Sequence, residues 1–332
     1  MSAPSDGAGP EHGALTAEGS VELAVIERSG LVESRHLGAA ALVDADGRVL
    51  RAVGDVHATV YPRSTLKPLQ SIAVLGTGAR FADDELVLAT ASHCGSPEHV
   101  AVVERMLAAD GRGASALQCP AQWPLGARAR SDRRAAGLGP SRETMNCSGK
   151  HAGFLRASDA LGGDAATYLD PEHPLQRRIR ATIEEWTGEP VRHSSIDGCG
   201  APLHATSLAA LARGIARVSS GSTPEAARLM TAVAAEPWAI DGPGRANTLA
   251  IERLGVLAKI GAEGLVVMGT RSGVAVAVKI LDGSMRATTP VALAILVAEG
   301  LVDEDAAAAV LDAIVEPVLG GDEVVGALRV TV

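Results

Sequence analysis

The sequence has 332 residues, enough for one large or two modest domains with a substantial core. Its hydrophobic fraction of 47% and charged fraction of 21% are those of an ordinary globular protein, and with only 2% aromatic residues the core must be aliphatic and alanine-rich. The net charge of −9 argues against a nucleic-acid partner or an anionic membrane surface, both of which favour a basic face.

Residues 1–20 are rich in Gly, Ala, Pro and Ser and contain no apolar run. They lack the cationic start and hydrophobic segment of a secretory signal, which predicts a disordered leader before a domain spanning 21–332. No segment approaches the roughly 20 apolar residues that cross a membrane. We therefore expect a cytoplasmic protein with no membrane partner.

Hydrophobic periodicity predicts strands near both ends of the chain and helices between them. The predicted strands are 21–27, 39–43, 48–53, 86–91, 264–268 and 273–279. The predicted helices are 64–75, 97–109, 150–161, 172–186, 203–213, 224–235, 290–299 and 303–315. This order favours an α/β protein of the α+β type, with an antiparallel sheet flanked by helices. The sheet would come from about 21–95 and 255–332, and a mostly helical domain would be inserted at about 97–250.

The first candidate for chemistry is Ser64-Thr65-Leu66-Lys67 at a predicted helix start. Residues three apart share a helical face, so the Lys67 amine can reach the Ser64 hydroxyl. Pro68 is tolerated only in a first turn, which places the helix start near Ser64 or Thr65. A lysine acts as a base near neutral pH only if its pKa is lowered. The alternative is that Ser64 simply caps the helix.

A second candidate follows the predicted strand at 86–91, where Ser92 and His93 precede a helix that begins at Pro97. Loops at strand ends often carry catalytic groups. Neighbours in an extended segment point to opposite faces, so Ser92 and His93 are poorly placed to act directly on each other. Capping of the helix by Ser96 is the alternative role for this segment.

The third candidate is the dense polar run 146–151, taken together with 196–200. The four cysteines, Cys94, Cys119, Cys147 and Cys199, show no disulfide spacing and are expected to be thiols or metal ligands. Cys147 and Cys199 could bind zinc, completed by His151, Asp197 or a neutral Lys150. Cys147 could also be a nucleophile, or an inert buried thiol.

Two further basic residues are weaker candidates. Arg245 lies in a Gly-Pro-Gly loop and could bind a carboxylate, and Lys259 lies among apolar residues that could remove its amine from water. The sequence contains no Walker loop and no dinucleotide fingerprint, so we expect no nucleotide cofactor.

These segments form an ordered set of motifs. They are Arg63-Ser64-x-x-Lys67-Pro68, Ala91-Ser92-His93, Asn146-Cys147-Ser148-Gly149-Lys150-His151, Asp197-Gly198-Cys199, Gly244-Arg245, Lys259-x-Gly261-Ala262-Glu263 and Lys279-x-x-Asp282-Gly283. In this order they resemble the type II, Rhizobium etli-like L-asparaginases, and the resemblance runs from about residue 21 to the C-terminus. It implies a fold similar to serine β-lactamases and glutaminases, and a homodimer.

The resemblance also implies roles for individual residues. The implied catalytic pairs are Ser64 with Lys67 and Ser92 with Lys259. The implied zinc ligands are Cys147, Lys150 and Cys199, with Asp197 close by. The implied substrate-binding residues are Arg63, which would hold the substrate carboxylate, and Asp197 and His151 near the site. The zinc ion would be structural or modulatory. A lysine that binds zinc must be neutral, which the metal itself promotes.

The implied activity is hydrolysis of L-asparagine to L-aspartate and ammonia through an acyl-enzyme on a serine, with backbone donors stabilising the oxyanion. Ser64 is favoured as the nucleophile because local helix geometry holds its lysine, and Ser92 is the open alternative. Two other functions are weighed against this one. The first is a Ser-Lys hydrolase acting on peptides or β-lactams, although no K-T-G-type motif follows. The second is a non-catalytic amino-acid-binding protein.

Overall fold

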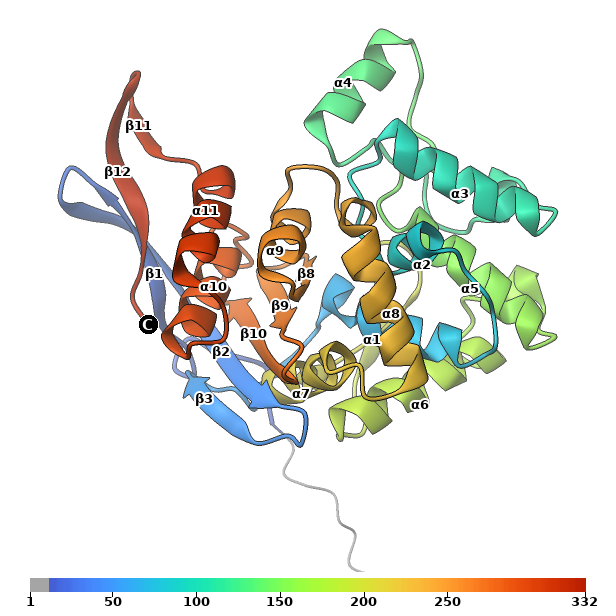
Figure 1. The fold of residues 1–332 in the computed structure, drawn as a ribbon, viewed down its shortest axis with the longest axis horizontal. Helices are drawn as coiled ribbons and strands as arrows, with labels where there is room; N and C mark the ends of the chain where they lie inside the picture. The colour runs from blue at the N-terminus through green and yellow to red at the C-terminus, as the bar shows by residue number, and fades with distance from the viewer. Residues whose placement is uncertain (1–11) are drawn as a thin grey trace, which may run out of the picture.

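The computed structural model describes residues 12–332, which form a sheet-based half and a helical half (Figure 1). The strands are β1 Val21–Arg28, β2 Leu31–Asp44, β3 Val49–Val53, β4 Thr59–Val60, β5 Ser194–Ile196, β6 Pro202–His204, β7 Thr206–Ser207, β8 Leu257–Gly261, β9 Leu265–Gly269, β10 Val274–Ile280, β11 Val318–Gly320 and β12 Glu323–Val330. The α-helices are α1 Lys67–Leu75, α2 Asp83–Thr90, α3 Pro97–Ala109, α4 Ala127–Ala135, α5 Ser148–Ala160, α6 Pro174–Thr187, α7 Leu208–Ser219, α8 Pro224–Ala235, α9 Ala246–Leu254, α10 Thr288–Ala298 and α11 Glu304–Ile314. Short 3₁₀ turns are η1 Arg63–Leu66, η2 Ala114–Ala116, η3 Ala165–Thr167 and η4 Pro237–Ile240.

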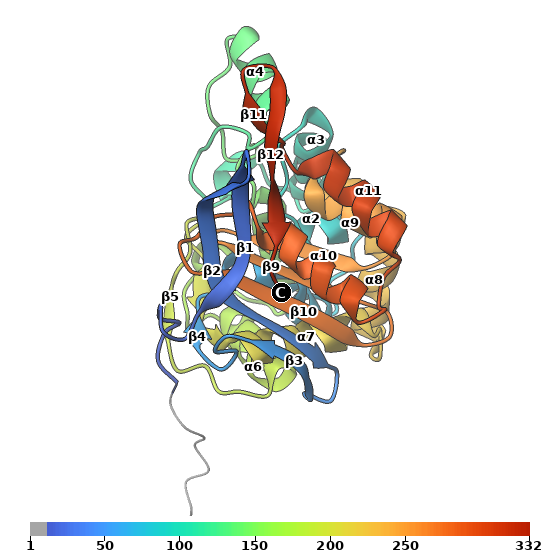
Figure 2. The same ribbon diagram turned by 90° about the vertical axis from the view of Figure 1, so that its left-hand side faces the viewer.

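The main sheet has eight strands in the order β11-β12-β1-β2-β10-β9-β8, with β3 paired to β2. All strand pairs in this sheet are antiparallel. Strand β2 pairs with β1 on one side and with β10 on the other, so strands from the N-terminal and C-terminal parts of the sequence form one sheet (Figure 2). The predicted fold class, an antiparallel sheet flanked by helices with a helical part, is therefore confirmed.

Helices cover both faces of the sheet. Every residue of β9 is buried, and α7 and α10 both pack on β9 and β10, so each helix covers one face. Helix α7 also contacts α1 and α6, which continues the core from the sheet into the helical half. The core is built almost entirely from Ala, Val, Leu and Ile, as the scarcity of aromatic residues predicts.

Two element predictions are wrong. Residues 86–91 belong to helix α2, not to a strand, because Asp83, Asp84 and Glu85 fill its first turn and Glu85 accepts a hydrogen bond from the Ala82 backbone N–H. Acidic side chains at a helix N-terminus favour the helix over the strand that the apolar run alone suggests. The helix predicted at 203–213 begins only at Leu208, after β6 and β7, where the Ser207 side chain caps it.

Some elements had no predicted counterpart, namely the strands β4, β5, β6, β7, β8, β11 and β12 and the helices α4 and α9. The exposed residues of β12 alternate weakly with half-buried ones, so its sequence has little of the apolar alternation that marks a strand. The other predicted helices and strands lie within a few residues of the observed ones, except that β2 extends to both sides of the predicted 39–43.

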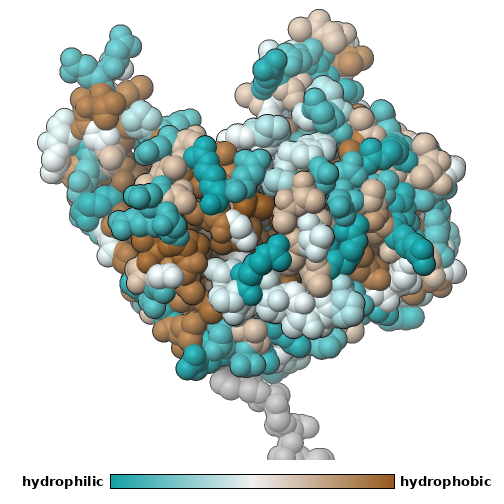
Figure 3. Space-filling view, viewed as in Figure 1, coloured by the Kyte–Doolittle hydropathy of each residue, from teal (hydrophilic) through white to brown (hydrophobic). Residues whose placement is uncertain are grey.

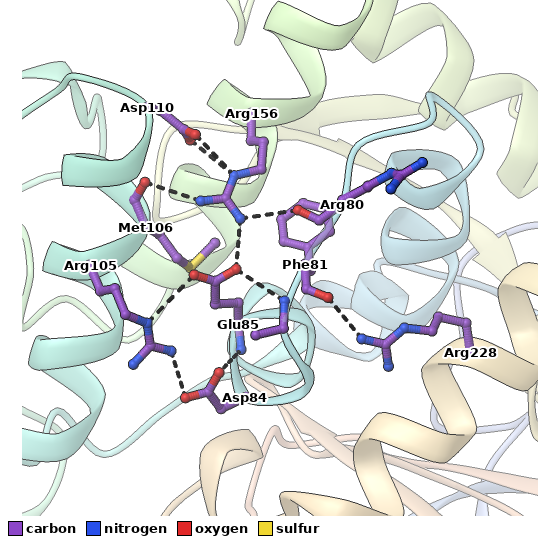
Figure 4. A network of polar contacts seen from close by, with 10 residues as sticks. Arg80, Phe81, Asp84, Glu85, Arg105, Met106, Asp110, Arg156 and Arg228 are labelled. Carbon is purple, nitrogen blue, oxygen red and sulfur yellow. Dashed lines mark hydrogen bonds and ion pairs between the residues drawn. The ribbon is translucent and has the colours of Figure 1, made fainter.

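A network of charged side chains ties together the helices that carry the polar motifs (Figure 4). Arg156 on α5 contacts Glu85 on α2 at 2.7 Å and Asp110 after α3 at 3.1 Å, with little exposure of the arginine. Because α2 leads into Ser92 and α5 begins just after Cys147, this network holds those two motifs at a fixed separation. Partly buried bidentate arginine contacts are stronger than exposed ion pairs.

The leader predicted over 1–20 lies partly outside the described residues. Within residues 12–20, Gly13 O accepts a hydrogen bond from Thr59 N at 2.9 Å, and Gly19 O accepts one from Asp55 N at 2.7 Å. Among residues 12–332, no helix is both long and apolar enough to span a membrane.

Two projections rise from the body, the β11–β12 hairpin on one side and α4 on the other (Figure 3). Hydrophobic side chains gather on this hairpin just below its hydrophilic end (Figure 3), and on its two strands Leu319 is 50% exposed and Val324 is 69% exposed.

Candidate active site

A pocket of about 340 Å³ brings most of the polar motifs together. Its lining includes Arg63, Ser64, Ser92, Cys147, Asp197, Cys199 and Arg245, with Ile260 and Gly261 from the end of β8 and Gln122, Leu125 and Met285 at other points. These residues come from η1, from the segment after α2, from the start of α5, from the turn after β5 and from β8, which are distant in sequence.

Ser92 is the centre of a buried contact with two lysines. Its Oγ lies 3.0 Å from Lys67 Nζ and 2.8 Å from Lys259 Nζ. Ser92 is 6% exposed, and both lysines are almost completely buried. The Ser92 side chain and the His93 ring point to opposite faces of the segment, as predicted, because His93 Nε2 contacts Ser148 Oγ at 2.8 Å instead.

The hydrogen bonds around the two amines differ in number. Lys67 Nζ has three acceptors, the Ala91 carbonyl, Ser92 Oγ and Cys147 Sγ, which match the three N–H donors of an ammonium group. Within residues 12–332, Lys259 Nζ makes hydrogen-bond contacts only with Ser92 Oγ and the Ile260 carbonyl, which leaves room for a lone pair on the nitrogen. Burial, and then the nearby positive charge of Lys67, lower the pKa of Lys259 well below its ordinary value. A neutral Lys259 amine can accept the proton of the Ser92 hydroxyl.

Ser64 lines the same pocket, but its side chain makes no hydrogen bond among the described residues. The structure therefore differs from the predicted Ser64–Lys67 pair. The reason lies in the turn, where the Lys67 N–H donates to the Ser64 carbonyl while the lysine side chain extends into the interior as far as Ser92. The predicted Ser92–Lys259 contact is present.

Cys147, Lys150 and Cys199 form a second buried cluster beside Ser92. Lys150 Nζ lies 3.0 Å from Cys199 Sγ, and Lys67 Nζ lies 3.2 Å from Cys147 Sγ. A hydrogen bond from the Cys147 thiol, together with the charge of Lys150, lowers the pKa of Cys199 far below its ordinary value, although burial opposes this. The same bond and burial raise the pKa of Cys147. The surroundings therefore favour the thiolate form at Cys199 over the thiolate form at Cys147.

Arg63 and Asp197 form an ion pair at the pocket wall, with Arg63 Nε 2.7 Å from Asp197 Oδ1. Glu263 Oε1 lies 3.8 Å from the same guanidinium. Arg63 has a φ of +53° and Glu263 a φ of +64°, in the left-handed region that few non-glycine residues adopt. Such a conformation costs about 1 kcal/mol or more and is commonly retained at functional sites.

His151 lies behind the pocket wall, not on it. It is completely buried, and its Nδ1 contacts the Tyr168 hydroxyl at 2.7 Å. The residue is absent from the pocket lining, while its neighbour Cys199 is part of it. His151 therefore does not face the pocket, although the sequence had indicated it as a substrate-binding residue.

Arg245 is a further charged residue that lines the pocket. Its Nε lies 2.5 Å from the buried carboxylate of Asp241, a residue that the sequence motifs did not indicate. The only signal was its spacing, four residues before the arginine across a glycine-proline turn.

Comparison with known proteins assigns a family. The family model described as L-asparaginase II matches residues 24–330. The chain belongs to the L-asparaginase II family. Its members' name identifies amide hydrolysis, and the buried Ser-Lys contacts provide the groups that an amidohydrolase requires. A search of the curated proteins finds no match.

Solved structures similar to this chain include a β-lactamase from Mycobacterium bovis and Mglu in its glutamate form. The first has 14% identity and a TM-score of 0.43, and the match covers 79% of this chain and 94% of that one. The second has 15% identity and a TM-score of 0.44, covering 80% of this chain and 61% of that one.

No group of three or more His, Cys, Asp or Glu side chains suited to a metal ion occurs within residues 12–332. The three residues predicted to bind zinc are two cysteines and a lysine. Because lysine is not one of those four residue types, this cluster is not a group of that kind.

Proposed function

We propose that this protein hydrolyses L-asparagine to L-aspartate and ammonia, with Ser92 as the nucleophile. The observation that carries the proposal is the buried Ser92 hydroxyl between two lysine amines, at the wall of a pocket in an L-asparaginase II chain. This order reverses the preference for Ser64, whose hydroxyl has no basic partner among the described residues.

The reaction begins when Ser92 Oγ transfers its proton to Lys259 Nζ and attacks the side-chain amide carbon. The charge of Lys67, 3.0 Å from Ser92 Oγ, stabilises the negative charge that develops on the reacting oxygens. Lys259 returns the proton to the amide nitrogen, the carbon–nitrogen bond breaks, and ammonia leaves. A water molecule then hydrolyses the ester, giving L-aspartate and restoring the Ser92 hydroxyl.

The Arg63–Asp197 pair is proposed to bind the amino-acid end of the substrate. An arginine guanidinium matches a carboxylate, and the Asp197 carboxylate matches an ammonium group. Their mutual contact at 2.7 Å keeps both charges oriented before substrate enters. Ser64, beside Arg63 in the pocket, is then available to hydrogen-bond the substrate or the attacking water.

The thiol cluster fits a zinc ion in its donor types. Two sulfur atoms and one nitrogen lie close together. The lowered pKa of Cys199 favours its thiolate form, which is the form that binds zinc. We propose that Cys147, Lys150 and Cys199 would hold the ion, which would supply positive charge beside the pocket. Lys150 would bind as a neutral amine, so zinc binding would release its proton.

A homodimer is also proposed, and the exposed hydrophobic side chains on the two strands of the β11–β12 hairpin support it. Light scattering after size exclusion would measure the mass of the assembly.

The test of the proposed function is ammonia release from asparagine, glutamine and β-aspartyl compounds, with a β-lactam reporter run in parallel. We expect release from asparagine, loss of at least about 100-fold in the Ser92→Ala variant, and a smaller loss in Ser64→Ala. Mass spectrometry of the quenched reaction should find the acyl group on Ser92. Acylation of Ser64, or cleavage of the β-lactam alone, would contradict the proposal.

A further inference from the structure

A buried carboxylate lies beside the Ser92–Lys259 pair in the turn between η4 and α9. Asp241 is 1% exposed, and its Oδ1 accepts a hydrogen bond from Arg245 Nε at 2.5 Å. Its Oδ2 accepts one from the backbone N–H of Asn247 at 3.4 Å. A buried charge is costly unless it is paired, so these contacts define the shape of the turn.

The turn holds the segment that carries Ser92. The Ser92 N–H donates to the Ile240 carbonyl at 3.1 Å, and the Cys94 N–H donates to the Asp241 carbonyl at 2.7 Å. Two consecutive carbonyls of the turn thus fix the backbone on either side of His93. The position of Ser92 Oγ depends on this backbone.

The start of helix α9, directly after this turn, holds the strand that carries Lys259. Asn247 is 1% exposed, and its Oδ1 accepts a hydrogen bond from the Ile260 N–H at 3.0 Å. The Ile260 carbonyl in turn accepts a hydrogen bond from Lys259 Nζ at 2.8 Å. Asn247 therefore restrains the backbone of Ile260, the residue whose carbonyl orients the lysine amine.

We propose that Asp241 and Asn247 are positioning residues that hold the Ser92 hydroxyl and the Lys259 amine at hydrogen-bond distance. Neither residue lines the pocket, and each acts through a backbone group that it restrains. The role rests on the proposed function, in which Lys259 removes the Ser92 proton. Proton transfer of this kind needs the two atoms within about 3 Å, and small displacements reduce its rate strongly.

The decisive variant is Asn247→Leu, which keeps the shape of the side chain and removes its acceptor. Thr248→Val is the matched control, because Thr248 is also buried and, among the described residues, its Oγ1 bonds only Gly242 N in the turn and the Pro237 carbonyl in η4. We expect Asn247→Leu to lower kcat at least tenfold with KM within about twofold, while Thr248→Val keeps kcat within about twofold. Asn247→Asp retains an acceptor oxygen and should recover part of the lost rate. Asp241→Asn should lower kcat in the same way as Asn247→Leu.

Lys259 is faced by Lys67, Cys147, Asp241 and Arg245, so loosening of its contact with Ser92 also changes its ionisation. In Asn247→Leu, greater access of water to the amine should move the rising limb of the kcat–pH profile to higher pH. A purely structural role for Asn247 would lower the unfolding midpoint and leave this limb in place. Equal kcat losses in Asn247→Leu and Thr248→Val, with no movement of the limb, would overturn the proposal.

Crystal structures of both variants provide a test that does not depend on the substrate. We expect the distance between Ser92 Oγ and Lys259 Nζ to exceed hydrogen-bond range in Asn247→Leu and to stay near 2.8 Å in Thr248→Val. An unchanged distance in Asn247→Leu would refute the positioning role even if the wild-type protein hydrolysed asparagine. Absence of ammonia release by the wild-type protein would instead refute the proposed function.

Discussion

Replacement of Lys259 by methionine should abolish activity and change how stability depends on pH. The substitution keeps an unbranched side chain at a fully buried position and removes the amine. It deletes two hydrogen bonds, to Ser92 Oγ and to the Ile260 carbonyl, both at 2.8 Å. At about 1 kcal/mol of net stability each, their loss alone would destabilise the variant by about 2 kcal/mol.

The wild-type lysine carries an opposing cost that varies with pH. Because burial and Lys67 lower the pKa of Lys259 in the folded protein, the unfolded chain binds a proton that the folded protein does not. Wild-type stability therefore rises with pH between the folded and the unfolded pKa of this residue, by up to about 1.4 kcal/mol per pH unit, and is lowest below the folded value. The methionine variant lacks this dependence.

Urea unfolding of both proteins between pH 6 and pH 9 would measure the effect. We expect the stability of the methionine variant relative to wild type to be greatest at the lowest pH and to decline as the pH rises. Its kcat should fall by about 100-fold or more, because a general base typically increases the rate by at least about 100-fold. A Lys259→Arg control, which keeps the charge but cannot act as a base, should be inactive at every pH. A stability difference that does not vary with pH would refute the assigned ionisation of Lys259.

Three further changes test other parts of the site. Asp197→Asn should raise KM for asparagine about tenfold or more with a smaller change in kcat, because Arg63 loses its charged partner; an unchanged KM would contradict its role in substrate binding. Gly149→Ala should lower the free energy of unfolding by about 1–3 kcal/mol in urea titrations, since a Cβ there would lie 2.5 Å from the Leu88 carbonyl oxygen; a neutral effect would show that α5 can move away from α2. Chelation should lower the melting temperature of zinc-loaded protein, and Cys199→Ser should remove the bound zinc measured by elemental analysis; equal zinc content in the variant would exclude the proposed ligand set.

Much of the fold follows from local sequence patterns. The helices α3, α5, α6 and α8 lie close to their predictions because each combines apolar repeats with boundary residues such as Pro97, Pro174 and Pro224. The prediction for 86–91 was wrong because a short apolar run fits a buried helix as well as a strand. The acidic first turn at 83–85 decided between them.

The candidate catalytic groups could be identified from the sequence, and the family resemblance also implied the contact between Ser92 and Lys259, but the contact between Lys67 and Ser92 was not predicted. Local periodicity links Ser64 to Lys67, three residues away, and supports that pair over any distant one. The folded chain instead brings Lys67 to Ser92, 25 residues away, and Lys259 to the same hydroxyl from 167 residues away. Asp241 and Asn247 were missed for the same reason, since they contact the site through backbone groups that carry no sequence signal.

The sequence by itself determined where reactive side chains cluster, where several helices start and which family motifs are present. These features depend on side-chain chemistry and on spacing within a few positions. Only the tertiary structure decided that Ser92 contacts both lysines, that His151 lies behind the pocket and that Lys150 lies beside Cys199. The physical reason is that a long, flexible lysine side chain takes its direction from the packing around it. That packing also sets the burial that lowers the pKa of Lys259, and burial is a property of the whole fold.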